Sequence, residues 1–271
     1  MNLKLILLIP VIVVAGFCST PRAQAVDATI IGVGTAIANY ANNPSIYIDQ
    51  VGNNNNVTIQ QNGTNTVGGV GQQAMPIQGT GNTVKIRQGD PTNSGQPNAV
   101  EAAVYGDYNT LALNQGITLN NQSTGKDSGQ HYQSISVSGT GNQINTEQTN
   151  TGAGAHYLST AVTGNYNTVA ASQADSTAKS AAININGDLN NVLTNQSGTG
   201  VHSLAVNLLG NNNSATVNQL GSTANTASIS ITNAGGPGSV NLTQTGGQSY
   251  YINTVCVQAG GCQPITVRQG N

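Results

Sequence analysis

Aromatic and charged side chains are scarce in this sequence. It has no tryptophan and one phenylalanine, and aromatic residues make up 4% of its 271 residues. Large aromatic side chains contribute much of the apolar area in most globular cores, so a thick globular core is not expected. Charged residues make up only 6% of the chain. Because no basic cluster stands out, binding to nucleic acid or to an anionic lipid surface is not expected.

The first 25 residues have the three parts of a secretory signal peptide. Lys4 supplies the positive charge, residues 5–17 form an apolar run, and Ala23-Gln24-Ala25 is a typical cleavage site. The apolar run is shorter than the roughly 20 residues that a membrane span needs, so an uncleaved anchor is the less favoured alternative. We therefore expect residues 1–25 to be a signal peptide, the exported chain to begin near Val26, and no membrane span to follow.

Groups that could carry out catalysis or bind a metal are also few. Without residues 1–25 the chain keeps five of its seven Lys and Arg and all nine Asp and Glu, which gives a net charge of −4. The acidic residues are scattered singly, which does not suit a pair of catalytic carboxylates. His131, His156 and His202 have no carboxylate or cysteine at the spacing of a metal site. The sequence thus predicts no enzyme activity, no catalytic residue, no metal site and no cofactor.

Asn, Gln and Gly are abundant, and they recur in one repeated template: apolar-x-apolar-x-Gly-x-x-Asn-x-apolar-x-apolar-x-Gln. The template glycines, which lie 27, 27, 33, 25, 23, 23, 25 and 25 residues apart, are Gly52, Gly79, Gly106, Gly139, Gly164, Gly187, Gly210, Gly235 and Gly260. The template asparagines are Asn55, Asn82, Asn109, Asn142, Asn167, Asn190 and Asn213, and the last two copies have Gly238 and Gln263 in this place. The glutamines that end the copies are Gln61, Gln88, Gln115, Gln148, Gln173, Gln196, Gln219, Gln244 and Gln269.

Apolar and polar residues alternate on both sides of each template glycine, which predicts a strand, a bend and a second strand in every copy. In the seventh copy, for example, Leu204, Val206 and Leu208 precede Gly210. One such pair of strands cannot bury its apolar side alone. Pairs stacked about 4.8 Å apart, in two sheets about 10 Å apart, can bury it continuously. We therefore predict an all-β, two-sheet β-solenoid, a cross-β stack of about nine coils.

The template Asn and the terminal Gln have the same parity as the apolar residues, so their side chains are expected to point inward. A lone buried amide is costly. In a stack, each amide can donate to one neighbouring copy and accept from the other, so that ladders of Asn and of Gln satisfy themselves. The alternative is that these residues are polar turn residues at the surface.

The template resembles the curlin repeat of curli fibre subunits, S-x5-Q-x-G-x-G-N-x-A-x3-Q, over most of the chain from about residue 45. The matching residues are Gln50, Gly52, Asn55, Val57 and Gln61 in one copy, Gly79, Gly81, Asn82, Val84 and Gln88 in the next, and Gly139, Gly141, Asn142, Ile144 and Gln148 in the fourth. Where curlin has its first Gln, the other copies have Ile77, Val104, Val137, Val162, Ile185 and Leu208.

The resemblance implies a cross-β solenoid at residues 45–271 that is exported through the periplasm and an outer-membrane secretion pore. It also implies self-assembly, alone or with other curlin-like subunits, into adhesive amyloid-like fibres of a biofilm matrix at the cell surface. Residues 26–44 are then a candidate secretion or targeting segment. Whether the chain is a major, nucleating or accessory subunit stays open.

A monomeric secreted β-solenoid adhesin that binds a polysaccharide or a host surface is the second hypothesis. Such a protein should present a column of matched outward residues. The outward residues in comparable places are instead mixed: Thr58, Lys85, Ala112, Asn145, Ala170 and Asn218. This mixture favours assembly over a single ligand-binding face.

The two ends of the solenoid lead to two further expectations. Unpaired strand edges are expected at both ends, and no capping sequence follows the last template Gln, so the chain is predicted to polymerise end to end. Cys256 and Cys262 flank Gly260-Gly261 and are expected to form a disulfide in an oxidising compartment, with free or intermolecular thiols as the alternative.

Charge is absent from one long stretch of the repeats. No Asp, Glu, Lys or Arg occurs from Leu189 to Val267, which marks this stretch as prone to β-assembly.

Overall fold

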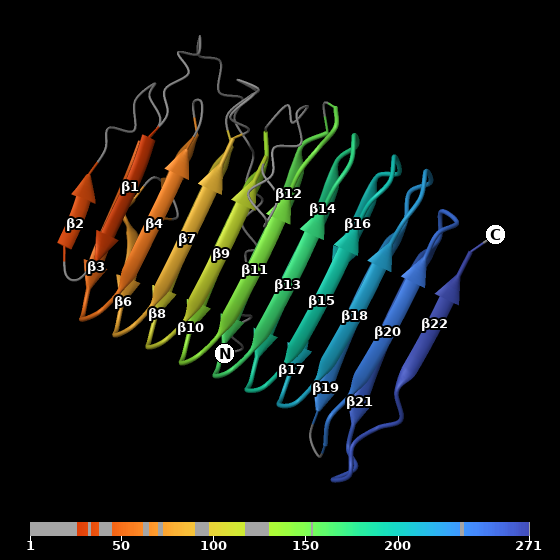
Figure 1. Cartoon of the computed structure of the whole chain (residues 1–271). Helices are drawn as coiled ribbons and strands as arrows, with labels where there is room; N and C mark the ends of the chain where they lie inside the picture. Colours follow the sequence, from red (N-terminus) through yellow and green to blue (C-terminus); the bar gives the residue numbers. More distant parts are fainter. Residues whose placement is uncertain are drawn as a thin grey trace, which may run out of the picture.

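The computed structural model describes residues 26–31, 34–37, 45–61, 65–69, 73–89, 98–116, 130–152, 154–233 and 236–270, the first two ranges by their backbone alone. The described residues form β-strands and no helix, in two sheets stacked as a β-solenoid of about eight turns (Figure 1). The predicted fold class is therefore confirmed. Within the described ranges, no helix is long and apolar enough to cross a membrane. The predicted signal peptide lies outside these ranges.

The first sheet has ten strands, and each parallel one is the second arm of a template copy. In spatial order they are β1 (Val26–Ile31), β4 (Asn56–Gln61), β7 (Thr83–Gln88), β9 (Thr110–Gln115), β11 (Gln143–Gln148), β13 (Thr168–Gln173), β15 (Asn191–Gln196), β18 (Ser214–Gln219), β20 (Ser239–Gln244) and β22 (Ile265–Gln269).

The second sheet has twelve strands and holds the first arms. In chain order they are β2 (Gly34–Ile37), β3 (Ser45–Val51), β5 (Thr66–Gly68), β6 (Met75–Gln78), β8 (Ala99–Tyr105), β10 (Tyr132–Ser138), β12 (His156–Thr163), β14 (Lys179–Asn186), β16 (His202–Ala205), β17 (Leu208–Leu209), β19 (Thr226–Asn233) and β21 (Ser249–Cys256).

Every strand from β3 onward pairs in parallel and in register with the same arm of a neighbouring coil. In the first sheet, Ile144 of β11 lies beside Val169 of β13, which lies beside Val192 of β15. In the second sheet, Val137 of β10 lies beside Val162 of β12. Equivalent template positions therefore form continuous columns, and the inward apolar columns of the two sheets meet in one buried core that runs the length of the solenoid.

The Gly-x-x-Asn bend requires glycine because successive bends lie in backbone contact. The seven template glycines from Gly52 to Gly210 all have a positive φ, between 104° and 140°. A methyl group added at Gly164 would overlap the carbonyl oxygen of Gly187 in the next coil, and the other bends up to Gly187 repeat this contact. Both the left-handed backbone and the close approach exclude larger residues here.

Three parts of the template differ from its sequence-based interpretation. The spacing of Leu204 before Gly210 predicts that the residue six before Gly79, Gln73, occupies the same inward column. Val67 occupies that column instead, because the first arm of the second copy is split into β5 and β6. The first arm of the seventh copy is likewise split, into β16 and β17. Gly260 has no positive φ, and Gly235 lies outside the described residues.

The grouping of Asn218 with Thr58 and Lys85 is also wrong. Thr216 occupies their column, and Asn218 lies in the neighbouring outward column, beside Asn195. The mixed character of the outward column is unchanged by this correction.

The N-terminal edge of the solenoid is covered by two antiparallel strands. Strand β1 pairs antiparallel with β4, and β2 pairs antiparallel with β3. The expectation of an unpaired edge at both ends is therefore wrong at this end. Part of the candidate targeting segment 26–44 forms these strands, and residues 38–44 lie outside the described ranges. No described strand pairs with the outer edge of β21 or β22.

Candidate functional site

The terminal glutamines form one ladder along the whole solenoid. Each Gln donates from Nε2 to Oε1 of the Gln in the next coil, from Gln61 through to Gln269, over 2.7 to 3.2 Å. From Gln88 to Gln244, the same amide also donates to a backbone carbonyl at the start of the first arm of its own coil, as Gln148 does to Tyr132 at 3.1 Å. Each of these Gln residues therefore joins neighbouring coils and ties the two sheets together.

The template asparagines form a second ladder on the other edge, from Asn55 to Asn213. The Oδ1 of Asn142 accepts from the backbone N–H of Asn167 at 2.9 Å and from its Nδ2 at 3.0 Å. The Nδ2 of Asn167 also donates to the carbonyl of Gly187 at 2.7 Å. These side chains are fully buried. They lie inside the bend rather than on its surface.

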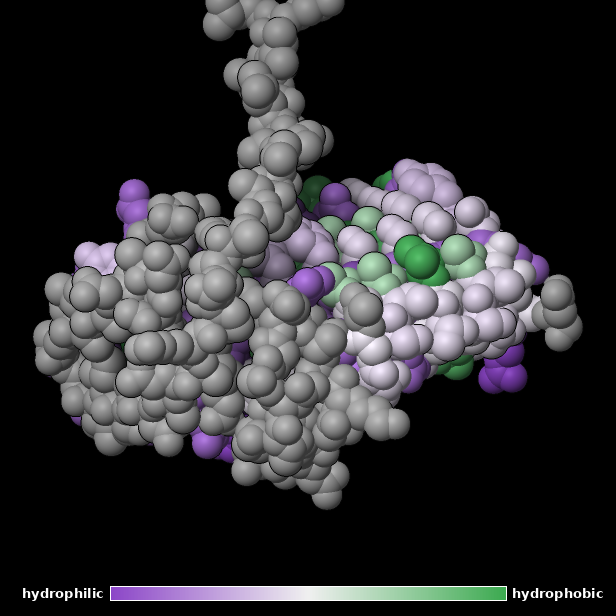
Figure 2. Space-filling view, turned by 90° about the horizontal axis from the view of Figure 1, so that it is seen from above, coloured by the Kyte–Doolittle hydropathy of each residue, from purple (hydrophilic) through white to green (hydrophobic). Residues whose placement is uncertain are grey.

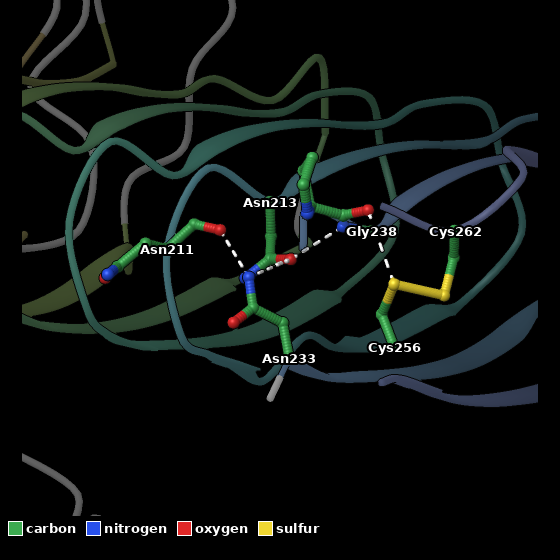
Figure 3. Close-up of a disulfide and its surroundings, with 7 residues drawn as sticks. Asn211, Asn213, Asn233, Gly238, Cys256 and Cys262 are labelled. Atoms are coloured by element: carbon green, nitrogen blue, oxygen red, sulfur yellow. Dashed lines mark hydrogen bonds between the residues drawn. A yellow bond between two sulfur atoms is a disulfide. The ribbon is translucent and has the colours of Figure 1, made fainter. Parts of the chain in front are cut away.

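The Asn ladder ends where the template loses its asparagine. Gly238 still donates its N–H to Oδ1 of Asn213 at 2.9 Å (Figure 3). However, Asn213 Nδ2 is buried without a partner among the described residues. In the last copy Gln263, which takes the Asn place, is exposed. The last two bends are therefore built differently from the first seven.

A disulfide closes the last bend. Cys256 and Cys262 are bonded, with their Cα atoms 5.5 Å apart (Figure 3). Cys256 is buried, and the N–H of Cys262 donates to the carbonyl of Pro237 at 2.9 Å. A covalent link thus holds the terminal coil together at the edge where the asparagine is missing.

A further ladder on the outside of the bend was missed by sequence reasoning. Asp107 Oδ1 accepts the backbone N–H of Thr80 at 2.7 Å, and Asp188 Oδ1 accepts that of Asn165 at 2.7 Å. Asn211 does the same for Asp188. The signal was the recurrent Asp or Asn directly after the template glycine. Two of the few acidic residues therefore have a structural role.

A buried polar column runs beside the Gln ladder and was also missed. Its residues, all at most 2% exposed, are Asn65, Asn98, His131, His156, Lys179, His202 and Asn225. The rings of His131 and His156 stack with centroids 4.8 Å apart, and the next two coils place Lys179 and then His202 in register. In five copies these residues lie eight before the template glycine, so extending the period-two pattern by one step would have located them.

The two basic groups that follow the stacked histidines are held by backbone oxygens. Lys179 Nζ donates to the carbonyls of Thr177 and Gly198 at 2.9 and 2.8 Å, and to Thr177 Oγ1 at 2.8 Å. Burial lowers the pKa of Lys179, and nearby Asp175 opposes this shift. Burial also lowers the pKa of His202, against the hydrogen bond from its ring to the Ser197 carbonyl.

The outer face of the second sheet carries small side chains between tyrosines. Tyr132 and Tyr157 stack with centroids 5.3 Å apart, and the Tyr132 hydroxyl donates to Glu101 at 2.7 Å. Burial raises the pKa of Tyr132, and the bond to Glu101 adds to that effect. Beyond them lies a shallow depression of about 490 Å³, lined by small residues such as Ser159 and Ala182.

In the described ranges, no group of three His, Cys, Asp or Glu is placed to hold a metal ion.

The coloured part of the solenoid in Figure 2 shows rows of side chains of intermediate hydropathy, with some strongly hydrophilic and some hydrophobic residues among them. Comparisons with protein-family models, curated proteins and solved structures find no match to this chain.

Proposed function

We propose that this protein is a structural subunit that stacks end to end into extracellular amyloid-like fibres. The observation that carries the proposal is the Gln ladder, in which nine coils repeat one hydrogen bond in a fixed direction. A further coil from another molecule can extend such a ladder with the same contacts. The parallel, in-register sheets offer their backbone groups for extension in the same way.

Three features support this proposal. The predicted signal peptide suits export, and the disulfide suits an oxidising compartment. The resemblance to the curlin repeat points to secretion through an outer-membrane pore and to an adhesive fibre at the cell surface. The ordered side chains of the interior bond to one another in ladders rather than converging on a pocket, which suits a structural subunit better than an enzyme.

The first test is assembly of the chain from residue 26 onward at micromolar concentration. We expect fibres in electron microscopy, binding of amyloid dyes, and a diffraction spacing of about 4.8 Å along the fibre axis. A chain that stays monomeric for days contradicts the proposal and favours the second hypothesis, a solenoid that binds a polysaccharide or host surface.

A matched pair of variants separates fibre assembly from loose aggregation. Ile144→Lys places an unpaired charge between the sheets, whereas Asn145→Lys places the same charge on the outside of the same strand. We expect Ile144→Lys to abolish ordered fibres and Asn145→Lys to retain them.

A further inference from the structure

Two buried acceptors at the N-terminal end of the solenoid have no partner among the described residues. Gln61 Oε1, the first acceptor of the Gln ladder, receives no hydrogen bond from any described residue, although Gln61 is fully buried. Gln50 Oε1 is in the same situation in the second sheet, with its side chain 2% exposed. A buried polar atom without a partner is costly, so a natural chain that keeps two of them here calls for an explanation.

The C-terminal end carries donors that no described residue accepts from. Thr254 Oγ1 of β21 is buried and makes no hydrogen bond within the described ranges. Gln269 of β22 accepts from Gln244, and no described residue accepts from its own Nε2. The last coil therefore carries a buried hydroxyl and a partly exposed amide that donate to no described residue.

These donors and acceptors lie in matching columns. The column that begins with Gln50 ends with Thr254, and the seven residues between them are Ile77, Val104, Val137, Val162, Ile185, Leu208 and Ile231. The polar residues of this apolar column are thus confined to its two ends. The Gln ladder likewise begins at Gln61 and ends at Gln269. Stacking the last coil of one molecule on the first coil of another would bring both pairs together.

Strands β1 and β2 satisfy the N-terminal edge only in part. Their backbones pair with β4 and β3, but Val26 lies opposite Gln61 and Gly34 lies opposite Gln50. Neither Val nor Gly has a side-chain donor. The pairing is also antiparallel, whereas all other neighbours in both sheets are parallel.

We propose that β1 and β2 temporarily cover a docking edge whose partner is the terminal coil of a second copy of this chain. Strands β22 and β21 of that copy displace β1 and β2 and pair in parallel with β4 and β3. Gln269 then donates to Gln61 Oε1, and Thr254 donates to Gln50 Oε1. This inference rests on the proposed end-to-end assembly and adds its polarity, its register and a self-blocking segment.

The same register matches the apolar columns. Ile265 and Val267 would lie against Val57 and Ile59, because β22 continues the columns that β4 begins. On the outer face, Arg268 would lie beside Gln60. The Asn ladder does not continue across this junction, since Gln263 is exposed at the disulfide-closed bend.

Crosslinking tests the register. The double variant Gln60→Cys with Arg268→Cys places two outward cysteines in one chain. They lie eight coils apart in the monomer but side by side in the proposed junction. There the Cα atoms fall within the range of about 4.4–6.8 Å that a disulfide spans. We expect a series of covalent multimers on oxidation of the fibres. The control, Gln60→Cys with Asn218→Cys, uses the same outward column inside the stack and should give none. Fibres without multimers in the first variant, or with them in the control, overturn the register while leaving assembly itself intact.

Locking the N-terminal strand tests the covering role. Thr29→Cys with Thr58→Cys joins register partners of β1 and β4. The lock keeps β22 of another molecule from replacing β1 beside β4. We expect the locked chain to elongate wild-type seeds at least about tenfold more slowly, because even the loss of the two buried hydrogen bonds of the junction has that effect. Wild-type rates from the locked chain overturn the proposal. If the wild type itself forms no fibres, the proposed function fails instead.

A double-mutant cycle tests the paired atoms. Gln50→Leu and Thr254→Val should each slow elongation about tenfold, and the double variant, which joins two apolar side chains, should recover most of the rate. Thr160→Val is the matched control, because Thr160 Oγ1 is also buried and has no partner in the described part of the chain, but lies in the middle of the solenoid. It should leave elongation unchanged. Additive losses in the double variant, or an equal loss from Thr160→Val, contradict the proposed junction.

Discussion

Among single residues, the buried amides and the buried Lys179 differ in the hydrogen bonds that they can make with the next coil. An amide has donors and an acceptor, so Gln can be followed by Gln through nine coils. Lysine has donors alone, and its column continues with His202 rather than with a second Lys. The amide ladders follow from sequence because Gln recurs in all nine copies and Asn in the first seven. The His and Lys column was missed because its residue type changes from coil to coil.

The titration of His202 gives a prediction at this scale. Burial lowers its pKa, so below the unfolded value of about 6.5 the unfolded chain takes up a proton that the folded chain resists. The free energy of unfolding should therefore fall as pH drops below 6.5, by at most about 1.4 kcal/mol per pH unit from this group. His202→Asn, which copies Asn225 in the next coil, should flatten that dependence in urea unfolding between pH 7.5 and about 5.

The core substitution Ile185→Val is the control for His202→Asn. It should lower the free energy of unfolding by about 1 kcal/mol at every pH and leave the slope with pH unchanged. If His202→Asn unfolds with the wild-type pH dependence, His202 does not contribute to it.

Among strands and bends, the parts that follow the regular repeat could be predicted from the sequence, and the irregular parts could not. The strand arms follow from the period-two pattern, and the bends follow from glycine at a fixed distance from Asn. The split of the second copy was missed because Gln73 and Met75 keep the expected parity, although Gln73 lies outside both β5 and β6. The last bend departs because the disulfide takes over the role of the missing Asn.

Two glycines that hold the same template place should respond differently to substitution. Gly164→Ala combines a φ of 127° with an overlap on the Gly187 carbonyl, so we expect a loss of about 3 kcal/mol or more in the free energy of unfolding. Gly260 has open space around its Cβ direction, and Gly260→Ala should stay within about 0.5 kcal/mol of wild type. Urea unfolding measures both. Similar losses would contradict the difference between the regular bends and the last one.

In the whole molecule, stacking could be predicted from sequence, but the covering of its N-terminal edge could not. Residues 26–37 lie outside the template, and nothing in their sequence specifies antiparallel pairing with β4 and β3. Charge is also unevenly distributed along the stack, since no charged residue occurs from Leu189 to Val267. Charged side chains repel when identical coils meet, so the uncharged coils are expected to dominate assembly.

A pair of buried valines tests that expectation. Val104 and Val206 are both at most 2% exposed between the sheets, the first among charged coils and the second in the uncharged stretch. We expect Val206→Asp to lengthen the lag of fibre formation more than Val104→Asp, at matched concentration and with dye fluorescence as readout. Equal lag times would show that all coils contribute alike.

The two amide ladders point their carbonyl groups in opposite directions. Gln173 Oε1 faces the coil before it, because it accepts from Gln148, whereas Asn142 Oδ1 faces the coil after it, because it accepts from Asn167. Dipoles aligned in one row add up, as they do along a helix. Here one row offsets the other, so a longer stack accumulates little net dipole moment from its side-chain amides. The electrostatic cost of adding a coil is then independent of how many coils precede it.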